Sequence, residues 1–362
     1  MKTPLVSIIT PVYNGEAYLS ECIDSVLAQT YDNWDYTIVN NCSTDCTLEI
    51  ARKYAAADSR IHVHNNETFV SAIANHNLAF GLISSQSKYA KAVFADDWIF
   101  PECLERMVKV AEEYPTIGIV GAYGLRGKTV IWNGLPYPST FVPGREVCRL
   151  RFLEGIYAFG GPTAHLVRSD LIRRRNPLYD ETNIHADTEM CITLMQESDF
   201  GFVHQVLSYT RDRPDSLTSS AEHFCTLITG ELYDLVKFGR KVLAPAEFDQ
   251  CLDHHLWSFY NLLASGILQR REREFWEYQK SQMAKLGLTL EWIRLMRAVA
   301  AILADVLCNP KLGIEQLMSG QSNPEVSRGV SYRPFCGRRK ATAVLGKTEG
   351  FMLDDFAGGS RQ

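Results

Sequence analysis

Short apolar runs alternate with amphipathic stretches through the first hundred residues of the chain. The apolar runs predict buried strands at residues 5–9, 34–39, 61–63 and 90–95. Apolar positions at helical spacing predict helices between them, at residues 17–27, 48–54 and 69–82. A chain in which strands and helices alternate in this way is typical of an α/β fold, with a mostly parallel sheet flanked by helices.

Polar side chains follow the predicted strands at the point where each one ends. They are the loop at residues 10–14, the pair Asn40 and Asn41, and the pair Asp96 and Asp97. Since ligands of open α/β sheets bind at the carboxyl ends of the strands, this edge predicts a binding site. Adjacent carboxylates repel each other unless a cation lies nearby, so Asp96 and Asp97 are candidates for a divalent-metal site. Alternatively, one of them only caps a helix that begins near Pro101.

The second half of the chain has a different pattern. Apolar and aromatic positions predict successive helices at residues 226–238, 246–268, 272–286 and 292–307. After Pro310 the sequence becomes polar, Gly-rich and basic, which predicts a flexible tail. A helical subdomain at residues 221–308, followed by a tail at 309–362, is therefore expected.

Composition narrows the class of protein. Of 362 residues, 46% are hydrophobic and 22% are charged, as in an ordinary globular protein. The net charge of -5 argues against a partner that is a nucleic acid. The ten cysteines lack paired short spacings, and no apolar leader follows the first residues, so we expect a cytoplasmic protein with reduced thiols.

Two common nucleotide motifs are missing from the chain. No G-x-G-x-x-G follows the first predicted strand, and no G-x-x-x-x-G-K-[ST] occurs in the sequence. Neither a dinucleotide fingerprint nor a Walker loop therefore explains the polar sheet edge.

Four motifs occur in order over the first hundred residues: VSIITPVYN at 6–14, SVLAQTY at 25–31, VNNCSTD at 39–45 and FADDW at 94–98. Together they resemble the inverting GT-A glycosyltransferases of family 2. The resemblance continues with GGPTAHLVR at 160–168, LYDE at 178–181 and HADTE at 185–189. It implies a Rossmann-like GT-A domain over residues 1–220, with a nucleotide-sugar half at about 1–101 and an acceptor half at about 102–220.

The resemblance also implies a nucleotide site. Pro11 and Tyr13 would lie beside the base and Asn41 at its edge, with a UDP-sugar favoured and thymidine or guanosine diphosphosugars next. Asn40 and Asn41 stand where the family usually has an acidic pair, and an amide both donates and accepts hydrogen bonds. Alternatively, the asparagines simply close a turn.

For the metal, the resemblance implies that Asp96 binds Mg²⁺ or Mn²⁺ together with the donor diphosphate, with Asp97 as its neighbour. Phe94 stands where the family motif usually has its first acid. Arg211 and Arg213 match a basic loop and would bind phosphate oxygens, since guanidinium groups do so bidentately. The alternative is that both arginines are solvated surface residues.

For catalysis, the resemblance implies that Asp187 is the base that deprotonates the acceptor, with Glu189 as the substitute. Asp187 begins a predicted helix, whose dipole would keep the carboxylate ionised. Without the resemblance, the simpler interpretation is a first-turn acid that stabilises its own helix.

These implications combine into an expected function. The chain would be a metal-dependent hexosyltransferase of polysaccharide biosynthesis, moving sugar from a nucleoside diphosphate to a hydroxyl of a cell-surface glycan or lipid-linked acceptor. The basic tail leaves open a peripheral contact with the inner face of the membrane. The rival hypothesis is a catalytically inactive sugar-nucleotide-binding or scaffolding protein of the same fold.

Overall fold

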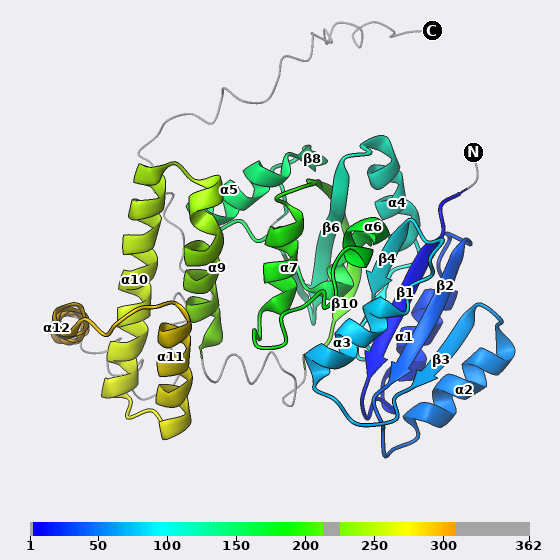
Figure 1. Ribbon diagram of the computed structural model, residues 1–362, viewed down its shortest axis with the longest axis horizontal. Coiled ribbons are helices and arrows are strands. Elements are labelled where there is room, and N and C mark those ends of the chain that lie inside the picture. The colour runs from blue at the N-terminus through cyan, green and yellow to red at the C-terminus, as the bar shows by residue number, and fades with distance from the viewer. Residues whose placement is uncertain (1–2, 133, 213–224, 309–362) are drawn as a thin grey trace, which may run out of the picture.

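The structure is a computed structural model that describes residues 3–132, 134–212 and 225–308 (Figure 1). Its strands are β1 (Val6–Val12), β2 (Trp34–Asn40), β3 (Ile61–Asn65), β4 (Tyr89–Ala92), β5 (Trp98–Ile99), β6 (Ile117–Arg126), β7 (Thr129–Ile131), β8 (Phe141–Val142), β9 (His165–Arg168) and β10 (Asp199–Thr210). Its α-helices are α1 (Leu19–Leu27), α2 (Thr47–Ala57), α3 (Ala72–Gly81), α4 (Cys103–Glu113), α5 (Gly144–Glu154), α6 (Ser169–Arg173), α7 (Ala186–Leu194), α9 (Thr226–Val242), α10 (Pro245–Leu268), α11 (Arg273–Lys285) and α12 (Trp292–Cys308). A 3-10 turn, η1, spans Pro162–Ala164.

One sheet runs through the first part of the chain, in the order β3-β2-β1-β4-β9-β6-β10-β5. Strands β3, β2, β1 and β4 are parallel to one another, as are β6 and β10. Strand β9 lies antiparallel between β4 and β6 and so joins the two parallel groups. The predicted α/β architecture with a mostly parallel sheet is confirmed.

Two strand ends differ from the prediction. Residues 10–12, expected in a loop, continue β1, while the strand expected to reach residue 95 ends at Ala92. Pairing of β1 with β4 ends at Ile9 and Ala92, so Pro11 lies beyond that ladder and its missing N–H leaves no bond unmade on the β4 side. The chain then turns sharply, because Asp97 N donates to Phe94 O at 2.9 Å. The acidic pair therefore lies in a turn.

Alternating side chains of the central strands enter two apolar clusters. Ile8 and Ile38 pack with α1 and α4, whereas Ile9 and Val39 pack with α3, α5 and α7. This alternation follows from the period of two along a strand and accounts for helices on both faces of the sheet (Figure 1). It leaves the carboxyl ends of the strands to the loops that follow them.

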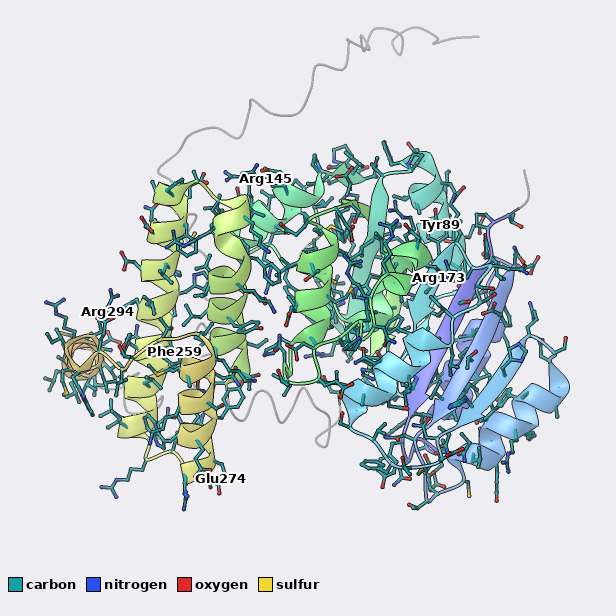
Figure 2. The ribbon with its side chains drawn as sticks, in the orientation of Figure 1. Tyr89, Arg145, Arg173, Phe259, Glu274 and Arg294 are labelled. Atoms are coloured by element: carbon teal, nitrogen blue, oxygen red, sulfur yellow. The ribbon has the colours of Figure 1, made fainter. Side chains whose placement is uncertain are left out.

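Helices α9 to α12 form the predicted helical region. Phe259 is buried between these helices, while Glu274 points outward (Figure 2). Helix α9 also sends Leu235, Phe238 and other side chains into the apolar cluster of the sheet, so it contacts both regions. The domain boundary expected near residue 220 and the tail expected at 309–362 lie outside the described residues. Among the helices of the described ranges, none is both long and apolar enough to cross a bilayer.

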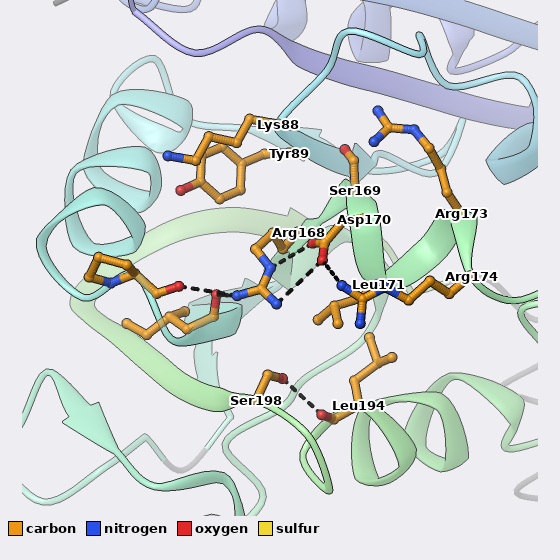
Figure 3. A network of polar contacts seen from close by, with 12 residues as sticks. Lys88, Tyr89, Arg168, Ser169, Asp170, Leu171, Arg173, Arg174, Leu194 and Ser198 are labelled. Carbon is orange, nitrogen blue, oxygen red and sulfur yellow. Dashed lines mark hydrogen bonds and ion pairs between the residues drawn. The ribbon is translucent and has the colours of Figure 1, made fainter.

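A polar network fixes the opposite edge of the sheet. Figure 3 shows the Arg168 guanidinium between the Asp170 carboxylate, at 2.6 Å, and the carbonyl oxygens of Pro115 and Ile117. Arg168 pairs with Tyr89 at the amino end of β4. Because Asp96 follows the other end of β4, this network holds the scaffold and does not enter the predicted ligand site.

Candidate active site

The loops after β1 and β2 are joined by hydrogen bonds. Asn14 adopts a left-handed conformation with φ of 50°, and its backbone N–H donates to Ser43 Oγ at 2.9 Å. Its side-chain oxygen accepts from Thr44 N at 2.9 Å, and Gly15 N donates to Thr47 Oγ1 at 2.7 Å. These contacts fix the loop that carries Tyr13 against the loop that carries Asn41.

An exposed aromatic pair lies at this edge. Tyr13 is 48% exposed and Phe69 is 60% exposed, and their ring centroids are 4.9 Å apart in an edge-to-face arrangement. Two large rings held partly in solvent offer a surface on which a flat base can stack. Pro11, the other residue expected beside the base, is buried in β1. Phe69 was missed by the sequence reasoning; its signal was a single aromatic residue in a polar stretch.

Asn41 is buried, and its amide orders the segment that carries Phe69. Its Nδ2 donates to Val70 O at 2.8 Å, while its Oδ1 accepts from Val70 N and from Asn66 Nδ2, each at 3.0 Å. The Asn41 amide thus bonds both the N–H and the carbonyl oxygen of Val70, as the backbone of a neighbouring strand would. The Asn41 side chain thus ties the end of β2 to a distant segment and does not close its own turn, and its contact with a base edge stays a prediction.

The two adjacent acids have different surroundings. Asp97 is only 5% exposed; its carboxylate accepts hydrogen bonds from Thr163 Oγ1 at 2.7 Å and from Arg211 N at 3.2 Å. Burial raises the pKa of Asp97 to about 7, although these hydrogen bonds oppose the shift. Asp96 is partly exposed. Asp97 therefore anchors the turn, and Asp96 is the acid that a ligand can reach.

A cation at this turn would need oxygen atoms from its ligand. Within residues 3–132, 134–212 and 225–308, no group of three or more His, Cys, Asp or Glu side chains could hold a metal ion. Two carboxylates are nonetheless the hard oxygen donors that Mg²⁺ and Mn²⁺ accept, and such ions commonly complete their shell with phosphate oxygens and water. The residues present fit a metal that binds together with a diphosphate.

Phe94 occupies the place of the first acid by stacking on a histidine. Its ring lies 4.8 Å from the ring of His76, with 16° between their planes. Burial lowers the pKa of His76 to about 4, so its imidazole is neutral at physiological pH. A neutral aromatic stack therefore lies beside the acidic turn. The sequence gives no signal for His76 as a site residue, because Phe94, on which it stacks, is 18 residues away.

Arg211 is held by protein groups in this structure. Its guanidinium forms an ion pair with Glu21, its Nε donates to Asp96 O at 3.2 Å, and it lies 4.6 Å over the Tyr18 ring. It ties the end of β10 to α1 and to the acidic turn. Binding of phosphate by Arg211 stays a prediction, and Arg213 lies outside the described residues.

Asp187 lies in the first turn of α7 and is partly buried. Burial raises the pKa of its carboxyl, although His185 and Arg151 nearby oppose the shift. Desolvation is the largest influence on this pKa and opposes the ionising effect expected of the helix dipole. That the dipole keeps the carboxylate ionised stays a prediction. Glu189 is only 8% exposed and forms an ion pair with Lys237. Because the Glu189 carboxylate is already paired with Lys237, Asp187 is the better candidate for the base.

A short segment connects the acidic turn to α7. At one end, the hydroxyl of Tyr157 forms a 2.8 Å hydrogen bond with Thr188, next to Asp187. At the other end, Thr163 donates to Asp97. Residues 157–163 therefore contact both the acidic turn and the first turn of α7, whose acids Asp97 and Asp187 are 90 positions apart in sequence.

A tryptophan covers the glycines in the middle of this segment. Trp132 has a φ of 71°, and a Cβ placed on Gly160 would lie 3.3 Å from its ring. Gly160 itself has a φ of 72°, so glycine is favoured there by conformation as well as by space. The indole ring is 5.5 Å from that of Tyr157, whose hydroxyl bonds Thr188, so the two rings form an aromatic contact beside the first turn of α7.

Comparison with known proteins points to one family. The sequence model described as Glycosyl transferase family 2 matches residues 7–180. The chain is 34% identical over 155 residues to the putative glycosyltransferase EpsE of Bacillus subtilis. The aligned region covers 40% of this chain and 54% of EpsE. It is 37% identical over 110 residues to the putative teichuronic acid biosynthesis glycosyltransferase TuaG of the same organism, covering 30% and 43%. The matches thus span about half the length of these relatives.

Solved structures share the fold at low sequence identity. S. aureus TarS 1–349 in complex with UDP-GlcNAc superposes with a TM-score of 0.59 at 20% identity, covering 87% of this chain and 92% of that one. Mannosyltransferase PcManGT from Pyrobaculum calidifontis, in complex with GDP-Man and Mn²⁺, gives a TM-score of 0.52 at 13% identity, covering 88% and 85%. The expected GT-A fold with a helical C-terminal region is confirmed.

Proposed function

Because the chain belongs to glycosyl transferase family 2 through residues 7–180, we propose that it transfers a sugar from a nucleoside diphosphate to an acceptor hydroxyl with inversion. One observation carries this proposal: the segment at 157–163 contacts both Asp97 and the neighbour of Asp187. Inverting transfer needs a group that holds the leaving diphosphate and a base for the acceptor, at opposite ends of one site.

The donor would bind along the carboxyl ends of β1, β2 and β4. Its base would stack on Tyr13 and Phe69, the exposed aromatic pair, with Asn41 holding the segment behind them. A UDP-sugar is the favoured donor, which TarS supports because it was solved with UDP-GlcNAc. Mannosyltransferase PcManGT was solved with GDP-Man, so a guanosine donor is the first alternative to test.

Asp96 would hold Mg²⁺ or Mn²⁺ together with the donor diphosphate, and Asp97 would keep the turn in place. When bound, such an ion neutralises negative charge that develops on the leaving diphosphate. Arg211 would add a positive charge close to Asp96, since its Nε is bonded to the Asp96 carbonyl. The PcManGT complex with Mn²⁺ supports this assignment.

Asp187 would act as the base. It accepts a hydrogen bond from Thr188 N at 2.8 Å through one oxygen, which fixes the direction of the carboxylate. Its raised pKa brings the carboxyl closer to the working pH, where proton transfer is most efficient. Glu189, the alternative base, would first have to leave its ion pair with Lys237.

The acceptor would be a hydroxyl of a cell-surface glycan or of a lipid-linked glycan. TuaG, a putative teichuronic acid biosynthesis enzyme, supports this acceptor class. Work on such acceptors would place the protein in the cytoplasm or at the inner face of the membrane. The second candidate is an inactive sugar-nucleotide-binding protein, favoured by Phe94, which puts a ring where the family has an acid.

Thermal unfolding with a panel of nucleoside diphosphates tests the proposal. We expect UDP with Mn²⁺ to raise the melting temperature of the parent, and expect Asp96→Ala to lose the metal-dependent part of that rise. Asp249→Ala, an exposed acid on α10, is the matched control and should behave as the parent. No stabilisation by UDP, GDP or dTDP in the presence of metal would overturn the donor site. Binding without any donor turnover would favour the inactive alternative.

A further inference from the structure

Four residues of α9 lie on one face of that helix and contact the candidate acceptor half. They are Thr226, Gly230, Asp234 and Lys237, at spacings of four, four and three, which place side chains along one stripe of a helix. Their partners are Glu189 of α7, Arg151 of α5, and His185, which directly precedes α7. The four residues are called the α9 stripe below.

The first two residues of the stripe hold His185. The imidazole Nε2 of His185 is 2.9 Å from Thr226 Oγ1, within a hydrogen bond. The same ring lies against the bare backbone of Gly230, where an added Cβ would come within 2.5 Å of His185 Cδ2. Only a residue without a side chain leaves room for the ring in this position. His185 is thus fixed on two sides by α9.

His185 is also the N-cap residue of α7, directly before its first residue Ala186. Its carbonyl oxygen accepts the first helical hydrogen bond from Glu189 N at 3.1 Å, and its backbone N–H donates to Asn183 Oδ1 at 3.0 Å. Asp187 follows two residues later, in the first turn. The ring that α9 holds and the Asp187 carboxylate therefore belong to residues two positions apart at the start of α7.

The remaining residues of the stripe fix the surroundings of the same turn. Lys237 forms an ion pair with Glu189, and Arg151 donates to Asp234 Oδ2 at 3.1 Å. The Arg151 guanidinium lies 4.9 Å over the ring of Tyr157, whose hydroxyl bonds Thr188. The stripe therefore reaches α7 directly, and also through α5 and the segment at 157–163.

We infer that the α9 stripe, through His185, positions the base Asp187 and so makes the helical region part of the catalytic machinery. This inference rests on the proposed function, in which Asp187 deprotonates the acceptor. Thr226, Gly230 and His185 are positioning residues, since they act on the reaction through the start of α7. Two lines of contact, a hydrogen bond and a steric fit, support the same conclusion independently.

Two substitutions disturb the contact in different ways. Thr226→Val removes the hydroxyl and keeps the shape, while Thr226→Ser keeps the hydroxyl. Gly230→Ala must push the His185 ring away by about 1 Å, because ordinary carbon contacts begin near 3.4 Å. Gly81→Ala is the matched control, since a Cβ on Gly81 meets no atom within 4 Å.

Turnover and hydrogen exchange test the inference together in the full chain. Assayed well below the melting temperature of each variant, Thr226→Val and Gly230→Ala should lower kcat by on the order of 10- to 100-fold with donor KM unchanged. Amide exchange of residues 184–190 should accelerate in both. Thr226→Ser and Gly81→Ala should match the parent in both measurements.

The outcomes separate the inference from the proposed function. If Asp187→Asn keeps turnover, the proposed base is wrong. If Asp187→Asn is inactive but Thr226→Val and Gly230→Ala keep the parent kcat, the positioning role is overturned. Unchanged exchange of residues 184–190 in both variants overturns it as well, whatever the activity, because α9 would then not hold the start of α7.

Discussion

The ion pair between Arg151 and Asp234 gives a sharp prediction about stability. The Arg151 side chain is 9% exposed and that of Asp234 is 2% exposed, so both charges are removed from water. A single hydrogen bond of 3.1 Å is recorded between them, and within the described residues Arg151 Nε and Asp234 Oδ1 have no hydrogen-bond partner. The pair is thus buried but only partly satisfied.

Removing one partner should cost much more than removing both. Asp234→Leu leaves the Arg151 charge buried and unpaired, which we expect to lower the free energy of unfolding by about 3–5 kcal/mol. The double variant Arg151→Met with Asp234→Leu replaces both groups by apolar side chains of similar length. Because the native pair leaves two polar atoms unbonded, the double variant should recover all of that loss, to within about 1 kcal/mol of the parent.

The pH adds an independent check with a fixed sign. Burial raises the pKa of Asp234 from 3.8 to about 7, although Arg151 opposes the shift. A folded-state pKa above the unfolded value means that the folded protein binds more protons, so its stability falls as pH rises from about 4 through about 7. The double variant lacks this slope and should gain on the parent between pH 5 and pH 8.

Urea unfolding followed by tryptophan fluorescence measures the free energies of unfolding of the parent, the single variant and the double variant at pH 5 and at pH 8. Gly81→Ala serves as a control for surface change, since its added methyl group meets no neighbour. The predicted cost of an unpaired Arg151 is contradicted if the single variant loses less than about 1 kcal/mol, or if the double variant is no more stable than the single one. Either result would mean that Arg151 finds water or another partner once Asp234 is gone.

Three further predictions concern the site. Tyr13→Ala should weaken binding of UDP about tenfold in calorimetry without lowering the melting temperature, since base stacking on a ring is worth about 1–3 kcal/mol; equal affinity would exclude stacking there. Thr163→Val should lower the unfolding free energy by about 1–2 kcal/mol, because Asp97 loses its 2.7 Å hydrogen bond, while Thr163→Ser should not. The value of kcat should rise with pH along an acid limb above the ordinary carboxyl range, because burial raises the pKa of Asp187, and a flat profile from pH 4 to 9 would contradict its role as the base.

The sequence predicted the fold through periodicity. Alternation of apolar runs and amphipathic stretches placed the strands and helices of the first hundred residues, because each element buries one face and local spacing records which one. The strand ends were less accurate. Apolar residues continue past Ala92 to Ala95, yet the chain leaves the sheet after Ala92, because it turns at the hydrogen bond from Asp97 N to Phe94 O.

The site was predictable where chemistry lies in short motifs and not where it depends on tertiary contacts. Asp96 and Asp187 stand in motifs that the sequence displays directly. The stack of His76 on Phe94 and the contact of His185 with Gly230 join distant segments, so spacing alone gives no signal for them. The burial that raises the pKa of Asp187 is a property of the fold, so the sequence displays the helix dipole at this acid and gives no signal for the opposing desolvation.

Whether Asp187 is the base is decided by metal-dependent turnover of a UDP-sugar by the parent and by Asp187→Asn, with UDP affinity measured on the same preparations. We expect Asp187→Asn to bind UDP as the parent does and to lose turnover by a factor of at least about 100, because a positioned base contributes about that much. Turnover that survives in Asp187→Asn at unchanged UDP affinity would contradict the assignment of the base and the reading of the site built upon it.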